Sequence, residues 1–440
     1  MRQMKDIKDE CFEKIPAEWK ISRLKALFSF GKGLPITKDD LTERGVSVIS
    51  YGQIHSKSNT GVCIQNELIR FVPESFLQTN LDSLVKQGDF IFADTSEDIE
   101  GCGNCVYVDR DMPLFAGYHT IILKSKADHE NKYLAYLFKT DAWRSQIRSV
   151  VYGIKVFSIT KKILNNTIVI LPNVIEQRKI VDYLDMECSR IDSVIEQTRV
   201  SIEEYKKLKQ SVITEAVTKG IRTDRPMKDS GVEWIGEICA DYDIYRLKFL
   251  LDSPLIYGAN EAGVPFDTLL PRYIRITDIT MDGKLKDDGK LSLPLDVAKD
   301  YMLEDDDILF ARSGASVGKA FIYKKEYGPS AFAGYLIKAN VGSRILADYL
   351  FLYTQSSLYE EWKNQIFIQA TIQNIGADRY SNLPVILPSV EEQHEIVCYL
   401  NAKCTEIDNL VASKEQLVSE LETYKKSLIY EYVTGKKEVQ

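Results

Sequence analysis

The sequence lacks a long hydrophobic run, a metal-binding spacing of Cys and His, and a surplus of positive charge. No segment approaches the ~18 consecutive apolar residues that a membrane-spanning helix requires. The first 16 residues contain no apolar core, so we expect no secretory signal there. Eight cysteines are scattered over 440 residues without a disulfide framework. This usage is typical of reduced thiols, and it predicts a cytoplasmic protein.

Composition alone does not indicate a simple basic nucleic-acid binder. The 56 Lys and Arg residues are outnumbered by 64 Asp and Glu residues, which gives a formal net charge of −8. DNA affinity depends mainly on the neutralisation of phosphates, so we expect this chain to bind DNA weakly when it is alone. Apolar residues make up 45% and charged residues 27%, which is ordinary for a globular protein. At roughly 100–200 residues per domain, the length predicts two to four domains.

The most informative feature is an internal repeat. Residues 171–218 align with residues 387–434 without a gap, and 19 of the 48 positions are identical. Chance would give about three identities at ordinary residue frequencies. The preceding segments repeat more weakly, with an offset that drifts from 223 to 216. The predicted organisation is module–helix–module–helix, with segments at 1–172, 173–222, 223–388 and 389–440.

The strongly repeated segments are predicted to be long helices because they contain no internal proline or glycine. Asn173 with Glu176 has capping-box spacing, and Ser389 with Glu392 repeats it. Apolar residues then follow the heptad pattern of a coiled coil. The predicted seam contains Ile191, Val194, Tyr205, Leu208 and Val212, weakened at Thr198 and Ser201, and in the second copy Ile407, Leu410, Leu417, Leu421, Tyr424 and Leu428, with Lys414 as a polar position.

Two matched helices in one chain most naturally pair with each other, and the repeat makes the pair antiparallel. The alternative is that each amphipathic helix lies on its own domain. The two modules are predicted to be mixed α/β, because short β-branched and aromatic runs alternate with turns. Helices are expected around 131–149 and 347–364. The predicted fold class is therefore α/β (α+β), with two tandem domains joined and separated by two long antiparallel coiled-coil helices.

Catalytic and metal-binding signatures are present only as near misses. The segment 314–320 resembles a phosphate-binding loop but is one residue short and lacks the Ser or Thr that holds Mg²⁺. Cys102 and Cys105 form one CxxC pair, but no second pair follows at zinc spacing. The set Asp348, Glu361 and Lys363 superficially resembles a nuclease site, but it falls on a predicted helix face that packs. We therefore expect neither a catalytic centre nor a metal site.

Polar loops follow corresponding strands in the two modules, in the same places but with different residues. Their side chains are of the types that contact base edges and phosphates. One frame with two sets of side chains is what recognition of two half-sites requires, whereas solvated loops also diverge freely, and the loops alone do not decide between these readings. The candidate DNA-contacting residues are Ser50, Tyr51, Gln53, His55, Lys57, Ser96, Tyr118 and Lys155 in the first module, and Arg275, Thr277, Arg312, Ser313, Lys319, Tyr335, Thr371, Gln373 and Asn374 in the second.

Several motifs together point to one family. Leu-Pro is followed by Glu-Gln at 171–177 and again at 387–393, and each copy leads into a long helix. The segment 229–236 reads DSGVEWIG, and both module openings carry an Arg-Leu-Lys. With these motifs the chain resembles, over essentially its whole length, the specificity subunits of type I restriction–modification systems. The departure is at 239–242, where CADY stands in place of a Pro and a Trp, and it bears only on local packing.

This resemblance implies two target-recognition domains, each of which reads one half of a bipartite double-stranded DNA site. It implies that the paired helices set the gap between the two halves of the site. It also implies that two methylation subunits and ATP-driven restriction subunits bind this chain in the cytoplasm of a prokaryotic cell. S-adenosylmethionine, ATP and Mg²⁺ would then belong to the partners. The helix residues expected to serve as spacer or partner contacts are Glu176, Gln177, Tyr183, Leu184, Ile191, Leu208, Glu392, Gln393, Tyr399, Leu400, Ile407 and Leu421.

Two other classes of function remain open at this point. A single-chain restriction enzyme or methyltransferase would need an added catalytic domain, although the two modules and two helices already use all 440 residues. A coiled-coil scaffold with protein-binding loops differs from the first interpretation only by the family resemblance.

Overall fold

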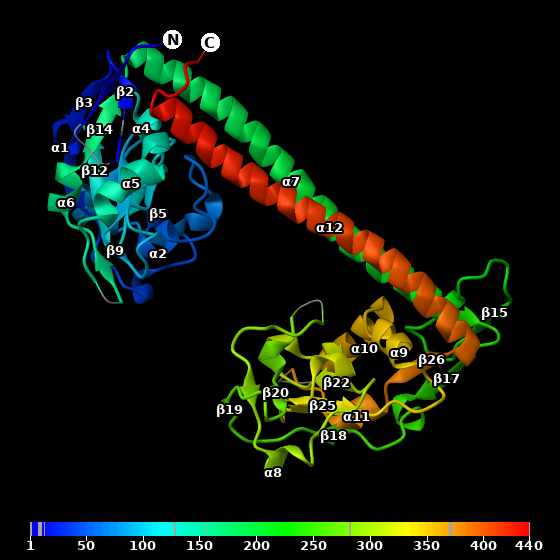
Figure 1. Ribbon diagram of the computed structural model, residues 1–440. Helices are drawn as coiled ribbons and strands as arrows, with labels where there is room; N and C mark the ends of the chain where they lie inside the picture. Colours follow the sequence, from blue (N-terminus) through cyan, green and yellow to red (C-terminus); the bar gives the residue numbers. More distant parts are fainter. Residues whose placement is uncertain are drawn as a thin grey trace. The chain divides into compact units, whose positions relative to one another are not determined.

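The computed structural model describes residues 2–7, 11–12, 14–126, 129–153, 155–280, 283–368 and 373–439. The chain forms two compact units: unit 1 comprises residues 1–197 and 417–440, and unit 2 comprises residues 198–416. Two long helices, α7 (Val174–Lys219) and α12 (Val390–Val433), are shared between the units (Figure 1). Each unit therefore contains the start of one long helix and the end of the other, and the predicted long helices are confirmed.

Unit 1 is built on two four-stranded sheets. The first, in the order β10-β8-β12-β4, is antiparallel, and in the second, β6-β5-β11-β7, the strands β5 and β11 are parallel. The strands are β4 (Phe28–Lys32), β5 (Val46–Ile49), β6 (Arg70–Val72), β7 (Leu84–Val85), β8 (Phe90–Ala93), β10 (Cys105–Tyr107), β11 (Leu114–Ala116) and β12 (Thr120–Ser125). Short elements of this unit include α1 (Leu24–Leu27), α2 (Tyr51–Ile54), α3 (Phe76–Thr79), α6 (Lys161–Asn166), β9 (Thr95–Ser96) and β13 (Phe157–Ser158).

Unit 2 repeats this plan. Its first sheet has the order β18-β25-β22-β23, and its second, β19-β21-β20-β24, again holds one parallel pair, β20 and β24. The strands are β18 (Ile256–Tyr257), β19 (Val264–Pro265), β20 (Arg272–Ile274), β21 (Leu291–Ser292), β22 (Ile308–Ala311), β23 (Ala320–Ile322), β24 (Ser330–Phe332) and β25 (Leu336–Ala339). The short helices α8 (Leu295–Ala298) and α11 (Ala377–Ser381) belong to the same unit. The mixed α/β prediction holds for both modules.

Each predicted module helix is two helices. The segment 131–149 forms α4 (Asn131–Phe138) and α5 (Asp141–Arg148), and the segment 347–364 forms α9 (Ala347–Tyr353) and α10 (Ser357–Ile368). Side-chain hydroxyls explain the breaks. Thr140 Oγ1 accepts from Trp143 N at 3.3 Å, and Ser356 Oγ accepts from Tyr359 N at 3.3 Å, so each hydroxyl starts a new helix.

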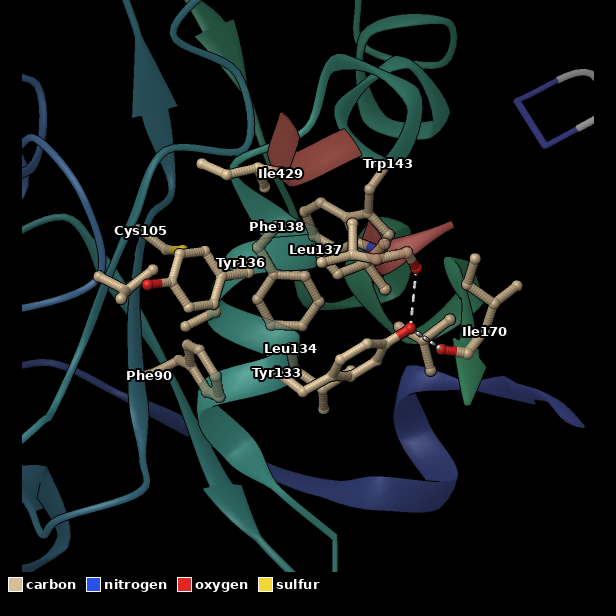
Figure 2. Packing of buried hydrophobic residues seen from close by; sticks show 14 of the residues in the cluster. Phe90, Cys105, Tyr133, Leu134, Tyr136, Leu137, Phe138, Trp143, Ile170 and Ile429 are labelled. Carbon is tan, nitrogen blue, oxygen red and sulfur yellow. Dashed lines mark hydrogen bonds between the residues drawn. The ribbon is translucent and has the colours of Figure 1, made fainter. Parts of the chain in front are cut away.

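The core of unit 1 is completed by the end of α12. Tyr133, Phe138 and Trp143 are fully buried beside the sheet, and Ile429 of α12 packs in the same cluster (Figure 2). The Tyr133 hydroxyl donates to the Val433 carbonyl at 2.8 Å. In unit 2, by the same logic, Ile213, Ala216 and Val217 at the end of α7 lie in the core with Tyr349 and Leu350. Each domain thus buries apolar side chains from both long helices.

Within each unit the two long helices run antiparallel. In unit 1, Lys425 Nζ lies 2.6 Å from the Asp192 carboxylate, and in unit 2, Lys209 Nζ lies 2.7 Å from Asp408. Residue numbers fall on one helix as they rise on the other, which confirms the antiparallel prediction. The rings of Tyr183 and Tyr432 lie with their centroids 4.5 Å apart and their planes tilted by 41°, which adds an aromatic contact in unit 1.

The phase of the predicted seam is wrong at every second position. The predicted seam residues that are exposed are Val194 (40%), Leu208 (47%), Leu410 (41%), Leu417 (42%) and Tyr424 (53%). The buried or half-buried positions alternate in steps of four and three: Leu184, Cys188, Ile191, Ile195, Thr198, Ile202, Tyr205 and Lys209 in α7, and Leu400, Cys404, Ile407, Val411, Lys414, Val418, Leu421, Lys425 and Leu428 in α12. Leu208 is therefore not a seam residue, and Ser201 is displaced from the seam by Ile202.

Lysine explains why the phase was predicted wrongly. Three seam positions carry lysine: Lys414, which the predicted seam already included, and Lys209 and Lys425, which no hydrophobic pattern would select in place of Leu208 and Tyr424. Their aliphatic stems lie along the seam while the ammonium groups reach polar or aromatic partners on the facing helix. The ammonium of Lys414 lies 5.5 Å from the centroid of the Tyr205 ring, and the other two form the ion pairs with aspartate.

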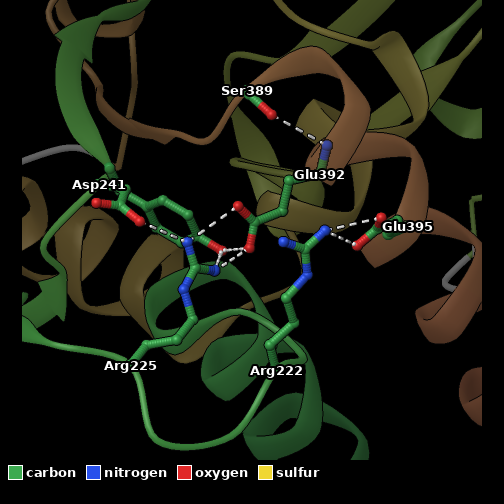
Figure 3. A network of polar contacts seen from close by, with 7 residues as sticks. Arg222, Arg225, Asp241, Ser389, Glu392 and Glu395 are labelled. Atoms are coloured by element: carbon green, nitrogen blue, oxygen red, sulfur yellow. Dashed lines mark hydrogen bonds and ion pairs between the residues drawn. The ribbon is translucent and has the colours of Figure 1, made fainter.

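An ion pair between a half-buried arginine and a buried glutamate fastens the start of α12 to unit 2 (Figure 3). Arg225 bonds Glu392 in the first turn of α12 and lies 3.1 Å from Asp241. Its guanidinium also lies 5.1 Å from the Tyr242 ring centroid, and the Tyr242 hydroxyl donates to Glu392. The hydrogen bond to Glu392 raises the pKa of Arg225, so the guanidinium stays charged. This arrangement joins a strand hairpin, a helix start and an aromatic side chain.

Unit 1 holds the same arrangement with different residues. Arg2 pairs with Glu18 and, at 2.7 Å, with Glu176 in the first turn of α7, and its guanidinium lies 5.4 Å from the Trp19 ring. Trp19 thus takes the place of Tyr242, which accounts for the departure in the CADY segment. Both arginines open an Arg-x-Met-Lys-Asp sequence, so the repeat extends to residue 2, further than the predicted alignment. The hairpins they precede are β1 (Met4–Asp6) with β2 (Lys14–Pro16), and β15 (Met227–Asp229) with β16 (Glu237–Cys239).

The glutamine that follows each glutamate is buried and joins the helix to its domain. Gln177 accepts from Glu130 N at 2.9 Å and donates to Pro172 O at 2.9 Å. Gln393 accepts from Leu346 N at 2.8 Å and donates to Pro388 O at 3.0 Å, so the two copies match. Strand pairs lead into both helices: β3 (Lys20–Arg23) with β14 (Ile168–Leu171), and β17 (Asp243–Arg246) with β26 (Pro384–Leu387). The Glu-Gln motif therefore positions each long helix on its own domain.

Replacing Ile195 by alanine should lower the free energy of unfolding by about 2–4 kcal/mol, because the seam loses a buried side chain. Val194→Ala, one residue earlier and exposed, should change it by less than about 0.5 kcal/mol. Urea denaturation followed by circular dichroism compares the two variants. Equal losses, or a larger loss for Val194→Ala, would contradict the seam described above.

Glu392→Gln should lower the free energy of unfolding by about 1–3 kcal/mol, because the half-buried Arg225 loses the charged partner of its hydrogen bonds. Glu395→Gln is the matched control on the same helix. It breaks only the solvent-exposed pair with Arg222, so it should leave the free energy of unfolding almost unchanged. Thermal and urea unfolding of both variants measure the difference, and similar costs would show that the pair of Arg225 with Glu392 does not anchor the helix.

Candidate nucleic-acid interface

The loops that follow β5 and β11 in one sheet and β8 in the other sheet of unit 1 are joined by hydrogen bonds. Tyr51 N donates to Tyr118 O at 3.1 Å, and Tyr118 N donates to Ser50 Oγ at 3.1 Å. Asp94 N donates to His119 O at 3.0 Å. With α2 and β9, these loops lie at the end of unit 1 opposite the start of α7 (Figure 1). The structure therefore brings together Ser50, Tyr51 and Tyr118, three of the candidate DNA-contacting residues.

An aromatic and imidazole cluster forms at this end. Tyr51 lies 6.4 Å from Tyr118, 6.4 Å from His55 and 5.5 Å from His119, measured between ring centroids. The Tyr118 and His119 rings are 4.0 Å apart. Tyr118 is 45% exposed, so an apolar ring edge stands beside imidazole nitrogens at the surface. Such rings contact bases and sugars while imidazole supplies a hydrogen bond.

Three of the predicted contact residues use polar atoms for hydrogen bonds within the domain. His55 donates from Nε2 to Thr95 O at 2.8 Å, and its Nδ1 accepts from Asn104 Nδ2 at 3.1 Å, so both ring nitrogens are engaged. Ser96 is 2% exposed and its hydroxyl donates to Asp98 O at 2.7 Å. The prediction that Ser96 contacts DNA is therefore wrong, because its buried hydroxyl holds its own loop in place. The side-chain oxygen of Gln53 accepts a hydrogen bond from Ser50 N at 3.1 Å. The side-chain nitrogen of Gln53 takes no part in this bond.

The second loop surface is in unit 2, after β22. Arg312 N donates to Tyr335 O at 3.0 Å, and Ile375 N donates to Arg312 O at 2.9 Å. Ser313 pairs with Asn374 through an isolated β-bridge. The Arg312 guanidinium carbon lies 5.0 Å from the centroid of the Tyr257 ring, which is 42% exposed. An arginine stacked on an aromatic ring is held in one orientation for recognition of a base or phosphate.

The two surfaces share one backbone frame. In unit 1, Asp94 N donates to His119 O and Asp94 O accepts from Ile159 N at 2.7 Å. In unit 2, Arg312 makes the same two hydrogen bonds with Tyr335 and Ile375, as described above. The strand registers agree, since Ala93 faces Thr120 and Ala311 faces Leu336. Asp94 therefore corresponds to Arg312 and His119 to Tyr335, so one frame carries two different pairs of side chains.

Comparison with known proteins identifies the family. A sequence model of the type I restriction modification DNA specificity domain matches residues 16–204 and 273–423. The chain belongs to this family. The MjaVIII type I restriction enzyme specificity subunit of Methanocaldococcus jannaschii is 26% identical over 342 residues, covering 73% of this chain and 76% of that protein. The EcoBI type I restriction enzyme specificity subunit of Escherichia coli is 24% identical, covering 65% of this chain and 61% of that protein.

A solved structure supports the fold. One chain of a solved structure superposes on this chain with a TM-score of 0.70 at 17% identity, covering 96% of this chain and 99% of that chain. That structure is described as "Structural basis underlying complex assembly and conformational transition of the type I R-M system". Within the specificity-domain family, this chain has a DNA-recognition role and is not the catalytic component. The family resemblance, the fold class and the DNA-recognition role predicted from the sequence are therefore confirmed.

The other candidate residues of this DNA-specificity chain are spread around the two frames. Arg275 is held by Asp278 at 2.7 Å and by Gly289 O, so its guanidinium organises its own loop. Burial and the neighbouring Lys286 and Lys363 lower the pKa of Lys319, which places three lysines in one region of unit 2. Such a cluster suits a phosphate. Lys57, Lys155, Thr277 and Gln373 are exposed, and Thr371 lies outside the described residues.

Asp94, His119 and Tyr257 are missing from the predicted set. Tyr257 reaches Arg312 only through the pairing of β18 with β25, which no local pattern shows. His119 was missed because the sequence FAGY occurs at 115–118 and again at 332–335, and aligning the two copies matches Tyr335 with Tyr118. Strand register instead matches Tyr335 with His119, one residue later. The sequence offered one signal for this difference, namely the spacing between predicted strands compared between the two copies.

The near-miss motifs have structural roles. Segment 314–320 leaves β22 and enters β23, and Gly314 adopts φ +73°, so it is a turn between strands. Burial raises the pKa of the Cys102 and Cys105 thiols. Within the described ranges, no group of three or more His, Cys, Asp or Glu is arranged to hold a metal. No helix among these residues is long and apolar enough to cross a membrane.

Proposed function

We propose that this chain reads a bipartite, asymmetric DNA sequence, with one half-site for each unit, and directs adenine methylation and ATP-dependent restriction by partner subunits. The shared frame carries the proposal. Asp94 and His119 occupy in unit 1 the backbone positions that Arg312 and Tyr335 occupy in unit 2. The two units therefore share one backbone geometry but present different side chains. Equal frames suit two equivalent placements on DNA, and unequal side chains suit two different base sequences.

Two methylation subunits are the proposed partners on the long helices. Exposed apolar residues recur there: Val194, Leu417 and Tyr424 in unit 1, and Leu208 and Leu410 in unit 2. The repeat offset of 216 relates Val194 to Leu410 and Leu208 to Tyr424, so each unit offers the same kind of surface. Two copies of one surface suit two copies of one partner.

The partners supply what this chain does not. The formal net charge of −8 gives little surplus for phosphate neutralisation, so the methylation subunits complete the positive surface around DNA. S-adenosylmethionine belongs to those subunits, and ATP and Mg²⁺ belong to the restriction subunits. The assembly acts on DNA in the cytoplasm of a prokaryotic cell.

A half-exchange tests the reading of one half-site per unit. Replacing residues 1–170 with the corresponding residues of a relative that has a different target should change one half of the methylated motif only. Methylome sequencing of cells that also carry the methylation partner gives the motif. The reciprocal exchange of 235–386 should change the other half. A motif altered in both halves by either exchange would contradict the proposal.

The helices are proposed to set the number of base pairs between half-sites, because α7 and α12 each continue without a break from one unit into the other. Inserting one heptad after Gln197 and another after Ser413 adds about 10 Å of helix, or about three base pairs. The recognised gap should lengthen accordingly, with both half-sites unchanged. Four-residue insertions, which shift the seam, are the control and should abolish methylation. An active heptad variant with the original gap would refute this role.

A further inference from the structure

His119 has an unusual backbone conformation at the surface of unit 1. Its φ is +54°, in the left-handed region that non-glycine residues rarely adopt. It lies between β11 and β12, and its carbonyl accepts from Asp94 N at 3.0 Å. Residues held in this region by their surroundings are concentrated at functional sites. The conformation keeps the imidazole beside the loop surface, with its side chain 39% exposed.

The carboxylate of Asp94 sets the orientation of the ring. His119 Nδ1 lies 2.8 Å from Asp94 Oδ1, and Thr95 Oγ1 donates to the same oxygen at 2.7 Å. A carboxylate accepts hydrogen bonds, so Nδ1 carries the hydrogen and Nε2 carries the lone pair of the neutral ring. The rings of Tyr118 at 4.0 Å and Tyr51 at 5.5 Å restrict the imidazole further. In the neutral form of the ring, the side chain is thus preorganised to present one acceptor.

The shared frame shows why this position matters. Tyr335 takes the corresponding place in unit 2, is 60% exposed, and neighbours Arg312. Both domains therefore hold an exposed ring at the same backbone position next to a charged side chain. A residue that only filled space would have no reason to recur as an exposed ring with a different charged partner.

We propose that His119 is a specificity-determining residue of unit 1, whose Nε2 accepts a hydrogen bond from an exocyclic amino group in the major groove. The amino groups available there are adenine N6 and cytosine N4. Asp94 is the positioning residue that fixes the ring. This inference rests on the proposed function, since it assigns one base contact within the first half-site.

His119→Asn and His119→Gly test the contact without straining the loop, because both residue types tolerate positive φ. The variants are assembled with the methylation partner, checked for an unchanged melting temperature, and assayed on all single-base changes of the wild-type site. Preference at one position of the first half-site should fall by about 5- to 150-fold. The second half-site should be unaffected. Arg312→Ala is the reciprocal control, with its change confined to the second half-site.

The outcomes separate this inference from the proposed function. If both variants keep the wild-type preference at every position, His119 does not read a base. If they weaken binding to all sequences alike and flatten its dependence on salt, the contact is to phosphate and the inference is equally wrong. If the wild-type assembly itself recognises no bipartite motif, the proposed function fails, whatever the variants do.

Discussion

A partly buried arginine–glutamate pair at the first turn of each long helix is the contact on which the placement of each domain depends. A guanidinium removed from water has to be paired, and here the partner is a carboxylate at a helix start, where the helix dipole also favours negative charge. In unit 2 the pair is Arg225 with Glu392, and in unit 1 it is Arg2 with Glu176. Each pair joins a hairpin, an aromatic ring and a helix, so none of the three can move independently. The two copies keep these residue types while their exposed loops differ.

Much of the fold was predictable because its signals are local. The repeat, the absence of Pro and Gly, and the alternation of apolar runs predicted the long helices and most strands of the modules. Part of what failed depended on contacts across the structure. A hydrophobic pattern could not place Lys209 and Lys425 in the seam, because their partners Asp408 and Asp192 are on the other helix. The breaks at Thr140 and Ser356 depended on single hydroxyl caps within otherwise helical patterns.

The site was predictable to the level of loops and not of atoms. Ser50, Tyr51 and Tyr118 were named from the loops that follow predicted strands, and they come together because β5 and β11 are neighbours in one sheet. Ser96 has the same residue type and setting in the sequence, yet its hydroxyl points to Asp98 inside the domain. His119 depends on a positive φ and on a one-residue difference in register between the copies. Neither property is visible before the strands are paired.

The burial of the end of α12 in the first domain bears on how the protein is made. The Tyr133 hydroxyl and the Val433 carbonyl are 300 residues apart in sequence, and Leu428, Ile429 and Tyr432 belong to the same core. A ribosome that works from the N-terminus releases the first domain's sheets long before these residues exist. The apolar surface that they cover must stay open until α12 has been synthesised, so unit 1 cannot finish folding before the residues of unit 2 that precede α12 have been made.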